Sequence, residues 1–89
     1  MIQIEYRSSF QRSLKKLSSD EISLFKETVE FFREDMYHPS LRNHPLDPPL
    51  EKYRSISLDD DLRILFRMID PDTALFLKIG SHRTIYTRI

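Results

Sequence analysis

Two histidines and an arginine are the side chains of this chain that are best suited to chemistry. His82 lies two residues after Gly80, the only glycine, and His44 precedes Pro45 in a proline-rich stretch. The lone glycine indicates a backbone that needs either a positive φ or a close approach. An imidazole exchanges a proton near neutral pH, and the planar guanidinium of Arg63 matches phosphate oxygens. Together they can divide the cleavage of a phosphodiester into base, acid and phosphate stabiliser.

Alternating residues predict that further cations lie on one face of a sheet. By strand parity Asp61, Arg63 and Arg67 share the face opposite the core, and Lys78 joins them from the following strand. Arg63 could instead pair with Asp61 or a neighbouring carboxylate and only make the sheet soluble. The residues alone leave both interpretations open.

Other kinds of site are less well supported by the spacing. The three histidines, with residues 59–61, could hold a metal ion, but they match no ligand motif. The chain has no cysteine, which excludes disulfides and thiolate ligands. Ser57 lacks a neighbouring partner for nucleophilic catalysis, and His38 has no evident role in its loop. We therefore expect neither a metal nor a cofactor.

Length and composition are typical of one soluble domain covering residues 1–89. The 89 residues are 39% hydrophobic and 31% charged. No apolar run approaches the roughly 20 residues that span a bilayer, and no signal peptide is evident, so we expect a cytoplasmic protein without a membrane partner. The 14 basic and 14 acidic side chains cancel, but residues 1–17 and 62–89 each carry a net charge of +3. Such local charge is compatible with an RNA partner.

The first half of the chain predicts a strand followed by a pair of helices. Residues 2–6 alternate as in a half-buried strand, and Ser8 or Ser9 can cap a short helix. Ser18 and Glu21 form a capping-box pattern that begins a second helix, and Pro39 is expected to end it. The apolar stripe of the short helix is Phe10, Leu14 and Leu17. The apolar stripe of the second helix is Ile22, Phe25, Val29, Phe32 and Met36.

The second half predicts a loop and then three antiparallel strands. Residues 37–51 contain four of the five prolines, which indicates a stiff, extended loop. Strands are expected at 53–58, 62–69 and 74–79, joined by acidic turns. The core is expected to take Leu62, Ile64, Phe66 and Met68, then Leu75, Leu77 and Ile79. The fold class is α+β in the order β-α-α-β-β-β, a small, mainly antiparallel, twisted sheet packed on an N-terminal αα-hairpin, with a polar and cationic outer face.

This order of elements resembles that of the RelE/ParE superfamily of bacterial type II toxins. Four sequence motifs also resemble those of the superfamily. They are FQRSLKKL near the start, NHPL in the loop, YRSISLDDDLRILFRM, and IGSHRTIY near the end. The resemblance covers essentially the whole chain. Its most specific parts are similar to the YafQ branch, in which a loop histidine precedes Pro-Leu and a Gly-x-His-x-x-x-aromatic signature ends the protein. It implies a RelE-like fold and a metal-independent endoribonuclease that cuts mRNA in the ribosomal A site and is inhibited by a cognate antitoxin.

The resemblance also implies roles for individual residues. The catalytic residues would be His44, His82, Asp61 and Arg63, and the RNA-binding residues would be Tyr86, Arg67, Lys78 and Arg83. Tyr86 takes the place of the closing aromatic that holds the scissile nucleotide, where YafQ itself has phenylalanine. Two residues depart from the branch: Ser57 stands where a further catalytic histidine is expected, and Leu62 replaces an aromatic beside the carboxylate.

These features lead to one main functional hypothesis and two alternatives. The main hypothesis is a ribosome-dependent mRNA endoribonuclease that leaves a 2′,3′-cyclic phosphate. The first alternative is a DNA gyrase inhibitor of the ParE kind, a group that generally lacks these histidines. The second is a degenerate toxin that only binds its antitoxin, which Ser57 makes plausible. In each version the partner is an antitoxin that docks an amphipathic helix or adds a strand.

Overall fold

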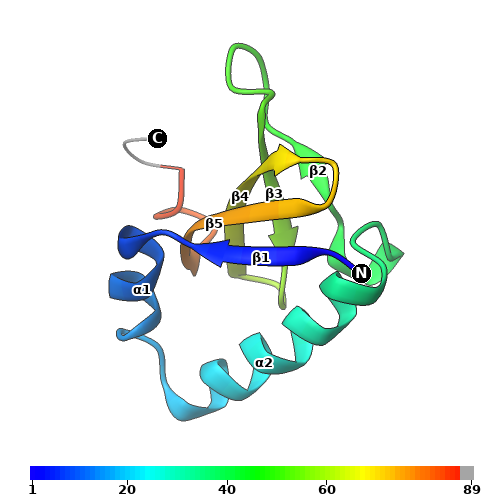
Figure 1. Ribbon diagram of the computed structural model, residues 1–89. Coiled ribbons are helices and arrows are strands. Elements are labelled where there is room, and N and C mark those ends of the chain that lie inside the picture. Colours follow the sequence, from blue (N-terminus) through cyan, green and yellow to red (C-terminus); the bar gives the residue numbers. More distant parts are fainter. Residues whose placement is uncertain (87–89) are drawn as a thin grey trace.

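The chain folds into a five-stranded sheet with both helices on one side (Figure 1). The protein is represented by a computed structural model that describes residues 1–86. Its elements are β1 (Gln3–Tyr6), α1 (Ser8–Leu14), α2 (Ser19–Glu34), a 3₁₀ turn η1 (Pro39–Leu41), β2 (His44–Pro45), β3 (Tyr53–Ser57), β4 (Leu62–Asp70) and β5 (Thr73–Ser81). The strands lie in the order β1-β5-β4-β3-β2, and β1 runs parallel to β5 while the other pairs are antiparallel. The predicted fold class is confirmed, and the short β2 lies within the predicted loop.

Helix α2 begins as its sequence predicts but ends earlier. The Glu21 backbone N–H donates to Ser18 Oγ at 3.2 Å, and the Ser18 N–H donates to Glu21 Oε1 at 2.9 Å, which completes the capping box. The helix ends at Glu34, so the prediction that Pro39 ends it was wrong. Asp35 adopts φ −153° and ψ 89°, a non-helical conformation that ends the helix, and Met36 then enters the core from the following turn.

Helix α1 uses its serines on β5 instead of on its own cap. The capping residue is Arg7, whose side chain makes no cap bond, so the expected cap at Ser8 or Ser9 was wrong. Ser9 Oγ donates to the Leu77 carbonyl at 2.8 Å, and the Ile79 N–H donates to Ser13 Oγ at 3.1 Å. These bonds continue the edge of β5 beyond the point where β1 stops pairing with it.

The main core lies between the helices and the inner face of the sheet. Four phenylalanines fill its centre without solvent exposure: Phe10, Phe32, Phe66 and Phe76. The Phe32 ring meets the Phe66 and Phe76 rings edge-on, with centroids 5.2 and 5.3 Å apart. Each such pair contributes about 0.5–1.5 kcal/mol beyond the burial of its area. Within residues 1–86, no helix is long and apolar enough to cross a bilayer.

A β-bulge in β5 reverses the expected faces of that strand. Leu65 pairs with Lys78, but the next residue of β4, Phe66, pairs with Phe76, so Leu77 is the extra residue. Strict alternation predicted Leu75 and Leu77 in the main core, which was wrong. Phe76 and Ala74 face the helices instead, and Ile79 returns to that side beyond the bulge.

The outer face of the sheet carries a second, smaller core. Leu65 and Leu77 are buried there beneath Ile85, and Leu46, Tyr53, Leu75 and Tyr86 pack around them. The expectation that this face is wholly polar and cationic was therefore wrong. Because Ile85 belongs to the turn that follows β5, this outer core fixes residues 82–86 against the sheet.

Candidate functional site

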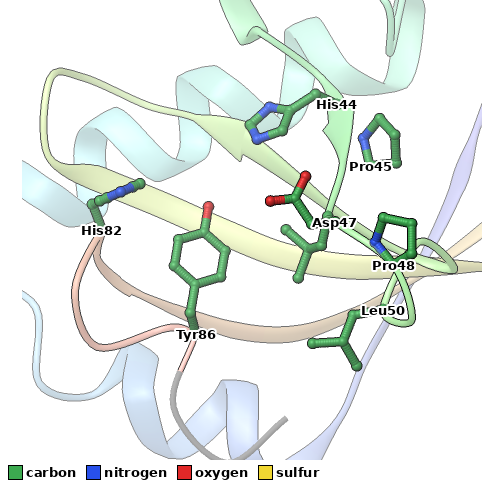
Figure 2. Close-up of a pocket in the computed structure, with 8 residues that line it drawn as sticks. His44, Pro45, Asp47, Pro48, Leu50, His82 and Tyr86 are labelled. Atoms are coloured by element: carbon green, nitrogen blue, oxygen red, sulfur yellow. The ribbon is translucent and has the colours of Figure 1, made fainter.

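A hollow between the β2–β3 loop and the C-terminal turn brings the two predicted histidines together. Its volume is about 440 Å³, and its polar side chains are His44, Asp47, His82 and Tyr86. Figure 2 shows His44 projecting from β2 and Asp47 from the loop after it, while His82 and Tyr86 come from the turn beyond β5. Residues 38 positions apart in the chain thus line one hollow. His38 lies elsewhere, in a different hollow beside Leu41 and α2.

The backbone before β2 fixes the orientation of the His44 ring. Arg42 adopts a left-handed conformation, φ 51° and ψ 42°, which is unusual for a residue with a side chain. Its carbonyl oxygen lies 2.7 Å from His44 Nδ1. Since a carbonyl only accepts, Nδ1 carries a proton, and in the neutral ring Nε2 is then the basic nitrogen.

Asn43 ties the same segment to the turn after α2 and to β3. Its side-chain amide donates to the Met36 carbonyl at 2.9 Å, and its oxygen accepts from Arg54 Nε at 2.8 Å. The Arg54 guanidinium in turn lies 5.7 Å from the centre of the Tyr37 ring. Asn43 therefore bridges the chain on either side of η1, next to a candidate catalytic residue.

His82 is held through its backbone by the β3–β4 turn. The His82 N–H donates to the Asp61 carbonyl oxygen at 2.8 Å and lies 3.4 Å from the Asp61 carboxylate. Asp61 thus contacts the histidine backbone, whereas the sequence suggested a pairing with Arg63. Gly80 makes this turn possible by a close approach: a Cβ there would lie 2.9 Å from Thr84 Oγ1, and its φ is not positive.

Tyr86 joins the C-terminal turn to the sheet and to His82. Its hydroxyl donates to Ser55 Oγ at 3.0 Å, and Ser55 is fully buried in β3. Its ring meets the His82 ring nearly edge-on, with centroids 5.2 Å apart and planes at 80°. Ser55 also pairs with His44 across β2 and β3. A path of contacts therefore connects both histidines through Tyr86 and Ser55.

Arg63 is bound to the β3–β4 turn. Its Nη1 donates to the Asp59 carbonyl at 2.6 Å, and its Nη2 donates to the Asp60 carbonyl at 2.9 Å. The same turn is held from within by Asp59, whose carboxylate accepts from the backbone N–H groups of Leu62 and Asp61 at 2.6 and 2.8 Å. These two bonds, with a smaller effect of Arg63, hold the pKa of Asp59 below its ordinary value.

The other sequence-predicted residues are spread over the outer surface. Lys78 lines a separate hollow of about 620 Å³ together with Arg12 and Lys16 of the α1 region, so its cationic neighbours come from a part of the chain that the sequence did not connect with it. Arg67 pairs with Tyr53 and Leu75, and Arg83 is exposed on the C-terminal turn. None of these three cations lines the His44–His82 hollow.

Ser57 lies away from that hollow as well. It is buried opposite Arg63 and lines two other hollows, one with His38 and one with Asp59 and Asp60. Residues 1–86 contain no cluster of three histidine or acidic side chains placed to hold a metal ion.

Sequence reasoning missed one member of the site, Asp47. Its loop has no hydrophobic period, and its spacing from either histidine matches no motif, so only the fold places it between them. The available signal was weak: a single carboxylate between Leu46 and Pro48 in a stretch otherwise rich in apolar residues.

The fold of this chain is similar to that of several solved toxins. YafQ from E. coli strain BL21(DE3) superposes with a TM-score of 0.78 at 16% identity, covering 97% of this chain and 99% of that one. The E. coli DinJ-YafQ toxin-antitoxin complex gives 0.77 at 16% identity over 96% and 97%. The toxin-antitoxin complex RelBE2 from Mycobacterium tuberculosis gives 0.67 at 23% identity over 90% of each chain.

These likenesses confirm the predicted resemblance at the level of the fold. No family model matches the sequence, and no curated protein matches it significantly. The chain therefore has a YafQ-like fold, at 16 to 23% sequence identity to these three structures.

Proposed function

We propose that this protein is the toxin of a type II toxin–antitoxin system and that it cleaves mRNA on the ribosome without a metal ion. The observation that carries the proposal is the meeting of His44 and His82 in one hollow, on a fold shared with known toxins. Such a toxin acts in the cytoplasm, where ribosomes are found. The ribose 2′-hydroxyl attacks the adjacent phosphorus, the 5′-oxygen leaves, and a 2′,3′-cyclic phosphate remains.

The geometry supports a division of labour between the two histidines. His44 is the general base, because the carbonyl that holds Nδ1–H leaves Nε2 to accept the 2′-hydroxyl proton. His82 is the general acid that protonates the leaving 5′-oxygen. As an imidazolium it also stabilises the negative charge that develops on the phosphate oxygens. Tyr86, beside His82, stacks on the scissile nucleotide.

The contacts of Arg63 support a positioning role. Its two Nη atoms bind the carbonyls of the turn that carries Asp61, and Asp61 binds the His82 backbone. Arg63 would have to give up these bonds to reach a phosphate as the sequence suggests. We therefore assign it to holding the turn, and through the turn His82. Lys78 and Arg83, with Arg67, bind RNA phosphates outside the hollow.

A cognate antitoxin is part of the proposal. The DinJ-YafQ and RelBE2 structures are complexes of a toxin with its antitoxin. In this chain β1 and β2 are the edges of the sheet. The β1 edge can accept an added strand, and the exposed Phe31 and Tyr37 offer apolar contacts for an amphipathic helix.

The test is induction in bacteria followed by mapping of new mRNA ends. The wild type should arrest growth and leave 2′,3′-cyclic phosphate ends, and the purified protein should cut ribosome-bound mRNA in the presence of EDTA. His82→Ala and His44→Ala should each lower the cleavage rate at least 100-fold, in the range that acid–base groups contribute. The matched control is His38→Ala, which changes the third histidine outside the hollow. A His82→Ala variant that cleaves at the wild-type rate would refute the mechanism.

Two further measurements, made beside this experiment, separate the alternatives. Inhibition of supercoiling by purified gyrase, with intact mRNA, would support an activity of the ParE kind. A tight antitoxin complex without growth arrest would indicate a toxin that has lost its activity.

A further inference from the structure

The hollow also holds the carboxylate of Asp47, which has no role in the proposed mechanism. Asp47 lies in the β2–β3 loop, which is closed by bonds from the Leu46 N–H to the Tyr53 carbonyl at 3.0 Å and from the Leu50 N–H to the Asp47 carbonyl at 2.9 Å. In Figure 2 its carboxylate lies between the His44 ring and the Tyr86 ring. Within residues 1–86 the exposed side chain makes no hydrogen bond, and it lines the hollow.

The walls around this carboxylate are mostly apolar. The hollow is lined by Pro45 of β2 and by Leu46, Pro48 and Leu50 of the loop, with the Tyr86 ring on the other side. Its volume of about 440 Å³ is in the range of small-ligand sites. A nucleobase is a flat ring that stacks on such surfaces and presents polar atoms at its edge.

The charges of the hollow decide how a nucleotide is oriented in it. An ionised carboxylate repels a phosphate, so the scissile phosphate lies on the side of His82, and the base lies toward Asp47. An ionised carboxylate also only accepts hydrogen bonds. The base that it selects must therefore present donors, and two adjacent donors can bind both oxygens at once.

Guanine is the base that meets this requirement. Its Watson–Crick edge carries N1–H and an exocyclic amino group side by side. Adenine and cytosine each present one amino group beside a ring nitrogen that accepts, and uracil presents one N–H between two carbonyls. We propose that Asp47 reads a guanine in this hollow, at the nucleotide next to the cleaved bond, and so sets the sequence preference of the enzyme. This inference rests on the proposed function for its substrate, single-stranded RNA.

Binding of free nucleotides tests the inference without relying on cleavage. NMR titration of the full chain with guanosine 3′-monophosphate should give a dissociation constant about 5- to 150-fold lower than with adenosine 3′-monophosphate, the range for a bidentate pair. Inosine 3′-monophosphate lacks the amino group and should bind more weakly than the guanosine compound to the wild type. Asp47→Asn should abolish the preference for guanine.

The matched control is Asp60→Asn, which removes an exposed carboxylate from the β3–β4 turn, outside the hollow, and changes the net charge equally. Asp47 is exposed, so its substitution should leave the melting temperature unchanged. Equal binding of the guanosine and adenosine compounds by the wild type, or an unchanged preference in Asp47→Asn, would overturn the inference.

Mapping of RNA ends then distinguishes this inference from the proposed function. Cleavage by the wild type without enrichment of guanine would refute the role of Asp47 and leave the nuclease intact. Guanosine binding that depends on Asp47, with no RNA cleavage by the wild type, would refute the nuclease and keep the guanine site.

Discussion

Removing the Tyr86 hydroxyl tests whether the C-terminal turn is fastened to the sheet through Ser55. Tyr86→Phe keeps the ring beside His82 but removes the donor that lies 3.0 Å from Ser55 Oγ. Ser55 has no solvent exposure, so its hydroxyl loses this partner without gaining water. A buried polar group left without a partner costs about 1–3 kcal/mol, and we expect the free energy of unfolding to fall by that amount.

The reverse substitution should cost less, which makes a double-mutant cycle informative. In Ser55→Ala the Tyr86 hydroxyl, on a half-buried residue, can turn toward water, so the expected loss is below about 1 kcal/mol. The double variant should then lose about as much as Ser55→Ala alone, so the coupling equals the whole Tyr86→Phe loss of about 1–3 kcal/mol. Urea unfolding followed by far-UV circular dichroism measures this, since the chain has no tryptophan. Losses that add to within about 0.3 kcal/mol would refute the reasoning.

Two further predictions concern the turns that carry the site. Gly80→Ala should lower the free energy of unfolding by about 1–3 kcal/mol, because the new Cβ meets Thr84 Oγ1. In urea unfolding, the double variant with Thr84→Ala should lose less than the sum of the two single losses, and strict additivity would argue against the contact. Because its folded-state pKa is lowered, Asp59 stabilises the fold above its unfolded pKa of about 3.9 and loses this effect as the pH falls through the lower folded value. The stability difference between wild type and Asp59→Asn should therefore be greatest near neutral pH and shrink below about pH 4; a difference that does not change between pH 7 and pH 2 would contradict this.

Local sequence signals were sufficient where one element determines its own structure. The capping box at Ser18 and the apolar stripe through Phe25, Val29 and Phe32 predicted α2 because both depend only on residues within one or two turns. The alternation of β4 likewise predicted which of its residues face the helices.

Local sequence signals failed where a residue far away in the chain determines the local structure. The bulge at Leu77 depends on how β5 pairs with β4, and no residue in β5 marks it, so alternation misplaced Leu75 and Leu77. The Ser9 hydroxyl binds the edge of β5, 68 residues along the chain, instead of capping its own helix. The two histidines could be predicted from the chemistry of their side chains. Asp47 could not, because only the folded loop places it in the hollow with them.

The two histidines are positioned by the outer layer of the sheet, on the side away from the helices. His44 pairs with Ser55, Ser55 binds Tyr86, and Tyr86 packs on His82, whose backbone is held by Asp61. The phenylalanine core lies on the other face. A substitution in that core that the fold tolerates should therefore change stability with little effect on the relative placement of the histidines. A substitution that loosens the outer cluster of Leu65, Leu77 and Ile85 should instead change the relative placement of the histidines, because Ile85 fastens the turn that carries His82 and Tyr86. The site thus depends most on the layer that its sequence pattern failed to identify.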